Sequence, residues 1–189
     1  MIQPRPTRKP SKPSCYTNTR LKSPGLHITR SINTSIDIYA IPEVIWENFT
    51  NVKIEQYSDP FLFKILGVPK PLKAEVISTG EGGQRIAYFA SGKRFIQRIT
   101  AWKPFQEYSF DFNPEPGFIV GHVFDLSTGI FRVANGTYIL TENKGRTKLQ
   151  LSTTYSLNKA VYPLFNLPVR LILKIFQRYL LRSIKTNSE

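Results

Sequence analysis

The sequence predicts one α+β domain in which a curved antiparallel sheet of about seven or eight strands wraps around a long C-terminal helix. Three observations predict this fold. Segment 31–40 alternates apolar and polar residues, as a strand with one buried face does, and a short helical pattern begins at Pro42. Strand-like segments separated by Gly- and Pro-rich turns follow. The last segment is apolar and long enough to lie across the sheet as a helix.

Residues 1–28 are predicted to form a tail outside the domain, which we place at 29–187. Prolines in this tail forbid a continuous helix, and the basic and hydroxyl residues between them offer little apolar surface to bury. The simplest interpretation is a solvated extension. An organelle-targeting peptide is the alternative, because such signals are rich in Arg and Ser and poor in acids. Targeting peptides normally form an amphipathic helix, however, and the prolines of this tail would interrupt it.

The first strand is followed by two predicted short helices. Alternate residues from Ile32 to Ile38 share one face of the strand. A helix is expected to begin at Pro42, because proline fits a first helical turn and the acidic Glu43 complements the positive end of a helix. Residues 52–67 are expected to add the second helix. The residues predicted for its inner side are Phe61, Phe63 and Leu66.

The middle of the chain contains seven strand-like segments. We place them at about 72–79, 84–91, 93–102, 106–113, 118–126, 130–141 and 146–157. Two of these segments alternate clearly between apolar and polar residues. One face carries Tyr108, Phe110 and Phe112 in the first, and Leu149, Leu151, Thr153, Tyr155 and Leu157 in the second. A sheet with one apolar face is antiparallel with that face covered, and the short turns favour a meander.

A long C-terminal helix is expected to cover the apolar face of the sheet. Asn166 suits the N-cap position, Pro168 fits the first turn, and an apolar run continues to Ile184. The basic residues of this segment fall within one arc of the helix, about 120° wide, which is expected to face water. They are Arg170, Lys174, Arg178, Arg182 and Lys185.

Charge and cysteine content restrict the class of function. The net charge is +13, but residues 1–30 carry seven Lys or Arg and no acid, so the body is only mildly basic, which argues against a nucleic-acid partner. The basic tail and helix arc are compatible with contact with an anionic membrane surface, and a basic face exposed to water is the simpler alternative. Cys15 is the only cysteine, which excludes an internal disulfide and, with two histidines, a structural zinc site. The apolar segment 169–181 is too short and too charged to span a membrane, so we expect a cytoplasmic protein, soluble or membrane-peripheral.

Catalytic motifs are scarce. The sequence has no nucleophile elbow, P-loop or dinucleotide fingerprint, and 80–83 is interpreted as a turn, so we expect no cofactor and no metal. His122 is a candidate acid–base, or polar anchor for a ligand oxygen, because it shares a predicted strand face with Phe124 and Leu126. A histidine bonded to a neighbouring strand or to water is the alternative. His27 lies beside the tail and is expected to be inert.

The aromatic residues favour a cavity for an apolar ligand. The chain has 13 Phe and 9 Tyr, and large planar side chains fill wide cores or line such cavities. The ligand-binding candidates are Tyr88, Tyr108, Phe110, His122, Phe124, Tyr138 and Tyr155. Each tyrosine equally fits an ordinary core position. Arg85, Arg94 and Arg98 lie on adjacent predicted strands, and one that faced the cavity would pair with a ligand carboxylate or phosphate, although such arginines more often decorate the wet face.

Several phrases along residues 30–186 resemble, in order and spacing, the SRPBCC or polyketide cyclase/dehydrase family. They are Ser35–Ile38 with Ala40–Trp46, Gly80–Arg85, Thr100–Pro104 with Tyr108–Phe110, and Gly145–Leu149 with Tyr155. That family is part of the START-like, birch-pollen-allergen-like helix-grip superfamily. The resemblance implies a helix-grip fold with a cavity between sheet and C-terminal helix. It implies little about activity, because the superfamily ranges from transporters and hormone sensors to cyclases.

Three functions are therefore considered. The first is a domain that binds or carries a hydrophobic or amphipathic small molecule, lipid-like or aromatic, in an internal cavity. The second is a cyclase/dehydrase-like enzyme that uses His122 or a pocket tyrosine as acid–base, for which His122→Ala should abolish turnover. The third is a peripheral membrane protein that exchanges lipid, for which binding to anionic vesicles should be salt-sensitive and lost on deletion of 1–28.

Overall fold

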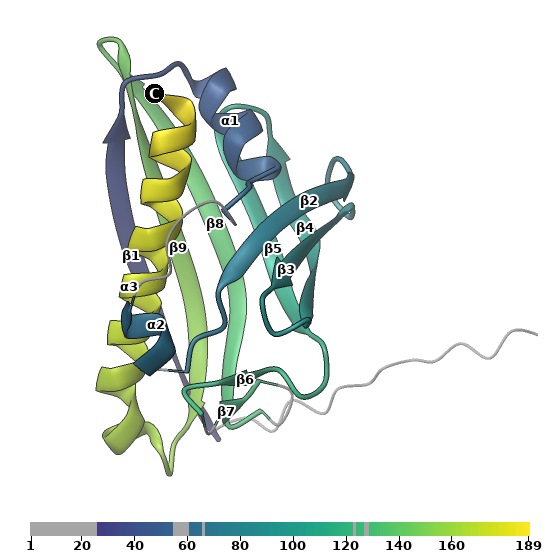
Figure 1. Cartoon of the computed structure of the whole chain (residues 1–189), viewed down its shortest axis with the longest axis vertical. Coiled ribbons are helices and arrows are strands. Elements are labelled where there is room, and N and C mark those ends of the chain that lie inside the picture. The colour runs from purple at the N-terminus through teal and green to yellow at the C-terminus, as the bar shows by residue number, and fades with distance from the viewer. Residues whose placement is uncertain (1–25, 55–60, 66, 123, 127–128) are drawn as a thin grey trace, which may run out of the picture.

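The computed structural model describes residues 26–54, 61–65, 67–122, 124–126 and 129–189. The predicted tail, with Cys15, lies outside these residues except for its last three positions, and the first strand already begins at His27. Figure 1 shows a strongly curved sheet with the C-terminal helix lying along its concave side. This arrangement confirms the predicted α+β fold.

Seven antiparallel strands form the main sheet, in the order β1-β9-β8-β5-β4-β3-β2. They are β1 (His27–Ile38), β2 (Pro71–Ser78), β3 (Gln84–Phe89), β4 (Arg94–Lys103), β5 (Glu107–Pro114), β8 (Phe131–Asn143) and β9 (Arg146–Asn158). From β2 to β9 the strands of this sheet pair in sequence order, so the predicted meander is confirmed. The first strand then pairs with the last, β9, and β2 forms the opposite edge.

Turn chemistry explains why neighbouring strands pair. Lys144 and Gly145 join β8 to β9, and both have positive φ, 48° and 80°. Asn143 pairs directly with Arg146 on either side of them, which makes a two-residue hairpin whose backbone twist matches that of the strands. The alternation predicted for β9 is confirmed, because every second side chain is buried on the concave face. These side chains are Leu149, Leu151, Thr153, Tyr155 and Leu157.

Helix α1 (Pro42–Thr50) begins at the predicted proline with Glu43 in its first turn. Its inner side buries Ile45, Trp46 and Phe49. The Trp46 ring makes edge-to-face contacts with neighbouring aromatic rings at centroid distances of 5.1–6.2 Å, an arrangement that aromatic quadrupoles favour. The helix is therefore held against the sheet by its buried apolar face.

The second predicted helix, 52–67, is present, but its predicted start is wrong. Helix α2 covers only Phe61–Ile65, and residues 52–54 run as extended chain along the edge strand β2. Ile54 N–H donates to the carbonyl of Leu72 at 2.7 Å, and Ala74 N–H donates to the carbonyl of Val52 at 2.9 Å. The free edge of β2 thus competes with the helix for the backbone groups of this segment.

The inner side predicted for that helix is confirmed at only one position. Phe63 is buried against Phe176 and Tyr179, with ring centroids at 5.9 and 5.2 Å. Phe61, also predicted to face inward, is 74% exposed. Leu66, the third inner residue, lies outside the described residues.

The predicted strand 118–126 is also wrong. It is a small hairpin of β6 (Ile119–Val120) and β7 (Phe124–Asp125), which pair with each other and not with the main sheet. Gly121 and His122 have φ values of 65° and 63°. Positive φ at two successive residues reverses the chain, so His122 lies at a turn and not on a strand face.

Helix α3 (Tyr162–Ser188) has 27 residues and spans about 40 Å. It begins four residues before the predicted N-cap, with a proline in its first turn at 163, and Pro168 lies inside the helix. Asn166 is not a cap: its side-chain carbonyl accepts a hydrogen bond from the Tyr155 hydroxyl at 2.8 Å. In the predicted basic arc, the first four residues are exposed, and Lys185 is half-buried and pairs with Glu189 at 2.6 Å. Within the described residues, no helix combines the length and hydropathy needed to cross a membrane.

Candidate functional site

A cavity of about 120 Å³ lies between the concave face of the sheet and α3. One ordered water needs roughly 10–15 Å³ on the same measure, so the cavity has room for a small organic molecule or a cluster of several waters. The sheet side is lined from β2 to β9, and α3 contributes one helix face. The α3 residues are Val169, Ile172, Leu173, Phe176, Gln177 and Leu180.

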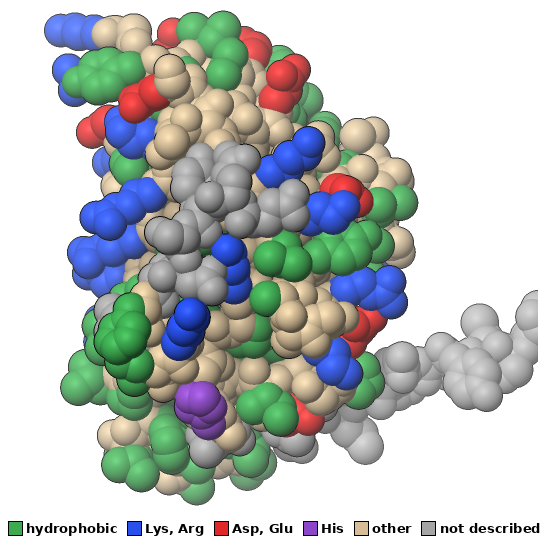
Figure 2. All heavy atoms as spheres, viewed as in Figure 1, with side chains coloured by type: hydrophobic (Ala, Val, Ile, Leu, Met, Phe, Trp, Pro, Cys, Tyr) green, Lys and Arg blue, Asp and Glu red, His purple; other side chains and the backbone are tan. Residues whose placement is uncertain are grey.

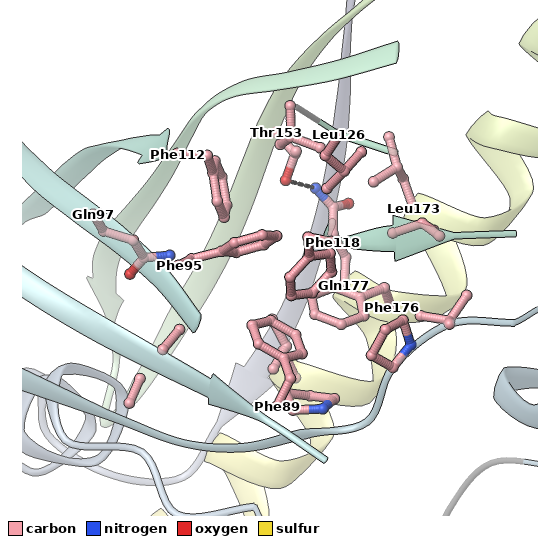
Figure 3. A pocket seen from close by; sticks show the side chains of 18 of the residues that line it. Phe89, Phe95, Gln97, Phe112, Phe118, Leu126, Thr153, Leu173, Phe176 and Gln177 are labelled. Carbon is pink, nitrogen blue, oxygen red and sulfur yellow. Dashed lines mark hydrogen bonds between the residues drawn. The ribbon is translucent and has the colours of Figure 1, made fainter. Parts of the chain in front are cut away.

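Phenylalanine rings form much of the wall. Those that line the cavity are Phe89, Phe95, Phe110, Phe112, Phe118, Phe124, Phe131 and Phe176. Figure 3 shows the rings of Phe89, Phe95 and Phe118 lying against one another, with Leu173 and Phe176 of α3 close by. The ring centroids of Phe95 and Phe118 are 4.3 Å apart. Water gains few hydrogen bonds from such a wall, so the interior favours apolar groups.

Polar side chains are few among the described lining residues. They are Lys73, Arg85, Gln97, Tyr138, Thr153 and Gln177. The Lys73 ammonium pairs with Glu75 at 2.7 Å, and both side chains are about 40% exposed. Lys73 therefore lines the cavity with the apolar part of its side chain. Gln177 Nε2 donates to Thr153 Oγ1 at 2.8 Å (Figure 3). It also donates to the carbonyl of Ile32 at 3.1 Å. Gln177 therefore cross-links α3 to the sheet.

Arg85 is the one fully buried cation of the described lining, with 3% of its surface exposed. Its Nη2 donates to the carbonyl of Phe49 at 2.6 Å, its Nε to the carbonyl of Thr50 at 3.2 Å, and its Nη1 to Gln97 Oε1 at 3.1 Å. Phe49 and Thr50 are the last two residues of α1, where free carbonyls carry the partial negative charge of the helix. The guanidinium therefore caps this helix end.

Strand register explains why only one of the three candidate arginines faces inward. Arg85 pairs with Gln97 across β3 and β4, and both side chains are buried. The side chains of Gln84 and Arg98, one pair away, and of Tyr88 and Arg94, three pairs away, point to the opposite face of the sheet. Accordingly Arg98 is exposed, and Arg94 pairs with a surface carboxylate, that of Glu115, at 2.7 Å.

The structure brings three of the seven candidate binding residues to the cavity. Phe110, Phe124 and Tyr138 line it. Tyr108 and Tyr155 are completely buried but lie behind the lining, and burial raises the pKa of the Tyr108 hydroxyl to about 12. Burial also raises the pKa of Tyr138 and Tyr155. Tyr88 is half-buried on the outer face, where the Lys73 ammonium lies 5.1 Å from its ring centroid.

The histidines lie outside the described cavity lining. His122 is exposed, and its Nε2 hydrogen-bonds with the carbonyl of Ile65 at 3.2 Å. A Cβ atom at Gly67 would lie 2.7 Å from the His122 ring, so only glycine fits beside it. Gly121 N–H donates to the carbonyl of Gly67 at 3.0 Å, which joins the same two loops. His27 Nε2 hydrogen-bonds with the carbonyl of Gly129 at 2.6 Å. Both histidines thus have structural partners.

Sequence reasoning missed several lining residues, notably Phe89, Phe95, Phe118 and Gln177. The sequence could have identified Phe95 as facing inward, because Phe95, Gln97 and Ile99 alternate with exposed residues along β4. No group of three or more His, Cys, Asp or Glu side chains gathers as a metal site within the described part of the chain.

Comparison with known proteins identifies the fold. No family model matches the sequence, and no curated protein matches it. Among solved structures, Ara h 8.0201 is 15% identical, with a TM-score of 0.54, and the match covers 84% of this chain and 96% of that one. Truncated norcoclaurine synthase from Thalictrum flavum is 14% identical, with a TM-score of 0.54, over 85% and 94% of the two chains.

XoxI from Bacillus cereus is similar in the same way, at 13% identity and a TM-score of 0.53, over 84% of this chain and 94% of that one. At these identities the likeness concerns the backbone architecture alone. The match extends over 94–96% of each solved structure and 84–85% of this chain, which here folds as a curved sheet holding a long helix. This chain therefore has the START-like, birch-pollen-allergen-like helix-grip fold.

Proposed function

We propose that this protein binds an apolar or amphipathic small molecule in the cavity between the sheet and α3. The observation that carries the proposal is the cavity itself, about 120 Å³ of space walled by phenylalanine rings and apolar α3 side chains. Close packing is the normal state of a protein interior, and space of this size costs stability unless something occupies it. A mostly apolar wall with a few placed polar groups is the usual arrangement of a ligand site.

Filling the cavity tests this proposal. Ala87 is buried on β3 and lines the cavity, so Ala87→Leu places three additional carbon atoms in the space. Ala90, exposed in the turn after β3, provides the matched control Ala90→Leu. The probe is N-phenyl-1-naphthylamine, a neutral apolar fluorophore whose emission rises on transfer from water.

We expect saturable probe binding by the wild type and by Ala90→Leu, and about ten-fold weaker binding by Ala87→Leu, which corresponds to roughly 1.4 kcal/mol. Circular dichroism must show that Ala87→Leu is folded. Equal binding by all three proteins would place the probe elsewhere, and no binding by the wild type would contradict the proposal. Native mass spectrometry of the purified protein provides an independent check for a carried molecule.

A cyclase/dehydrase-like activity has no specific support among the described residues. His122, the candidate acid–base, is exposed and outside the lining. Norcoclaurine synthase is an enzyme by its name, but its likeness to this chain is one of fold.

We propose a second role, lipid exchange at an anionic membrane surface, because of the exposed side of α3. Leu164 and Leu167 are each 74% exposed and Leu171 is 56% exposed, and the spacing of the three places them on one helix face. Basic residues of the predicted arc, Arg170 and Lys174 among them, flank the same face. Figure 2 shows hydrophobic side chains gathered at the lower end of the molecule, with Lys and Arg side chains along the edge above them.

A helix that exposes leucines beside a basic arc fits the interface of an anionic bilayer. The test is co-sedimentation with phosphatidylserine-containing vesicles and with neutral phosphatidylcholine vesicles. We expect binding to the anionic vesicles only, weakened by salt and by Leu164→Gln/Leu167→Gln. Glu81→Gln, an exposed substitution in the turn before β3, is the control that should bind as the wild type does. Binding indifferent to salt and to the leucines would contradict this role.

A further inference from the structure

We propose that the cavity selects an acid: an amphipathic molecule with a single carboxylate that pairs with Arg85 while its apolar body lies among the phenylalanine rings. This inference rests on the proposed binding function and names its ligand class. It follows from the burial of Arg85, from the number of its hydrogen-bond partners, and from its position in the wall of the cavity.

The guanidinium of Arg85 is a buried charge without an acidic partner among the described residues. Only 3% of the residue is exposed, and none of the ion pairs between described residues includes it. Burial of a full charge is costly unless an opposite charge or several hydrogen bonds offset it. The carbonyls of Phe49 and Thr50 supply only the partial negative charge of a helix end. The site therefore has a surplus of positive charge.

The hydrogen bonds of Arg85 are also incomplete. A guanidinium has five N–H donors, and three of them have acceptors among the described residues: two carbonyls of α1 and Gln97 Oε1. All three acceptors are neutral. The two donors left over belong to Nη1 and Nη2, the pair that binds the two oxygens of a carboxylate in a fork.

Arg85 meets the cavity among aromatic rings, with little of its own surface open to solvent. Its guanidinium lies 5.8 Å from the ring centroids of Phe110 and of Tyr108, and Phe110 and Tyr138 line the cavity with it. The Arg85 charge also reaches the Tyr138 hydroxyl, where it opposes the effect of burial on the pKa. An anion placed here would be shielded from solvent, where an ion pair is stronger than at a surface.

The charge balance selects the class of acid. One guanidinium balances one negative charge, which matches a carboxylate, whereas a phosphate monoester would bring a second, unbalanced charge into an apolar cavity. The rest of the described lining is mostly aliphatic and aromatic, which matches a hydrocarbon body. Arg94 and Arg98, on the outer face, have no part in this site.

The test compares ligands that differ only at the head group. Decanoic acid, decan-1-ol and methyl decanoate are titrated, below their aggregation limits, into the wild type, Arg85→Gln and Arg98→Gln by calorimetry. Arg85→Gln keeps an amide donor for the α1 carbonyls but removes the charge. Arg98→Gln removes an equal charge from the exposed face of the next strand.

We expect the wild type to bind the acid about ten- to hundred-fold more tightly than the alcohol or the ester, the ratio that a hydrogen bond to a charged group supplies. Arg98→Gln should keep that preference. Arg85→Gln should lose it, chiefly because the acid binds more weakly. A wild type that binds acid and alcohol equally, or an Arg85→Gln protein that keeps the preference, would overturn the inference and leave the binding function intact.

A second measurement does not depend on the folding of the variant. The carboxyl carbon of ¹³C-labelled decanoic acid bound to the wild type reports its ionisation by NMR. Pairing with Arg85 should keep the bound acid ionised below the pH at which the free acid protonates, because an opposite charge lowers the pKa of a carboxyl group. A bound acid that protonates at higher pH than the free acid would show burial without a partner and would overturn the inference. Failure of all three decyl compounds and of the neutral fluorophore to bind would instead contradict the proposed function.

Discussion

Gln177 on α3 donates a 2.8 Å hydrogen bond from its side-chain amide to the hydroxyl of Thr153 on β9. The same amide group accepts from the Thr34 hydroxyl at 2.7 Å and donates to the carbonyl of Ile32, so it joins the helix to β1 as well. Gln177 is only 1% exposed. A buried amide with all of these partners fixes the position of the helix over the cavity.

Gln177→Leu should therefore destabilise the protein although it adds apolar surface. The substitution leaves the Thr34 and Thr153 hydroxyls without this partner, which costs about 1–3 kcal/mol of the free energy of unfolding. Urea denaturation followed by circular dichroism measures the loss. Arg178→Gln, one residue along and exposed, is the control and should change stability by about 0.5 kcal/mol or less. A Gln177→Leu protein as stable as the wild type would show that the network contributes nothing net.

Two buried tyrosines should respond differently to removal of their hydroxyl groups. The Tyr108 hydroxyl is buried and has no hydrogen-bond partner among the described residues, whereas that of Tyr155 donates to Asn166 at 2.8 Å. Tyr108→Phe should be neutral or stabilising, because it removes an unsatisfied polar atom, and Tyr155→Phe should cost about 0.5–1.5 kcal/mol. Thermal denaturation of the two variants side by side measures the difference, and the reverse order of stability would contradict the hydrogen-bond assignment.

Stability should fall at alkaline pH because of Tyr108. Burial is the largest cause of its raised pKa, about 12 in the folded protein against 10.0 for the ordinary group, and the Arg85 charge opposes the rise. Below pH 10 the Tyr108 hydroxyl keeps its proton in both the folded and the unfolded state, so the contribution of this group to the free energy of unfolding does not change with pH. As the pH rises from 10 towards about 12, the unfolded chain ionises first, so the free energy of unfolding falls, by roughly 3 kcal/mol for this group.

Urea titrations at several alkaline pH values, with absorbance of the phenolate as a second signal, measure this dependence. Tyr108→Phe is the matched variant, and its stability should fall less steeply over the same pH range. Part of the remaining slope would come from Tyr138 and Tyr155, whose pKa values burial also raises, and part from Lys103, whose pKa the Glu107 carboxylate raises. Equal slopes in the wild type and in Tyr108→Phe would contradict the assignment to Tyr108.

Gly136 on β8 should not tolerate a side chain. It pairs with Phe110 on β5, and a Cβ atom at this position would lie 2.7 Å from the tip of the Phe110 ring. Gly136→Ala must push the ring towards the cavity or its neighbours, which should cost about 1–3 kcal/mol. Thermal denaturation measures the cost, with the exposed Thr141→Ala on the same strand as control. A Gly136→Ala protein with unchanged stability would show that the Phe110 ring moves freely.

The sequence predicted correctly which side chains of a strand point into the core where that strand is regular. In β9 the alternation of Leu149, Leu151 and Leu157 with polar residues identifies the buried face, because side chains of a strand point to opposite sides in turn. The presence of the long helix was equally predictable, since its apolar run and its basic arc are local properties of one segment. Its start was placed too late, because the first turn uses the proline at 163, and Asn166 is bound by the distant Tyr155.

Structures that depend on contacts with distant segments could not be predicted from the local sequence pattern. Residues 52–54 became extended because the free edge of β2 binds their backbone, and the reversal at Gly121 and His122 removes His122 from the face that alternation assigned to it. Both outcomes depend on segments far away in the chain.

By itself, then, the sequence determined the fold class, the meander, the buried face of β9 and the long helix, because each follows from the period of its apolar residues. Only the tertiary structure decided which arginine enters the cavity. Arg85, Arg94 and Arg98 look alike in sequence, but the β3–β4 register places Arg85 opposite Gln97 on the inner face, and the end of α1 supplies its carbonyl partners. The facing of a charged side chain is decided by which distant groups offset the loss of its water, and periodicity does not encode them.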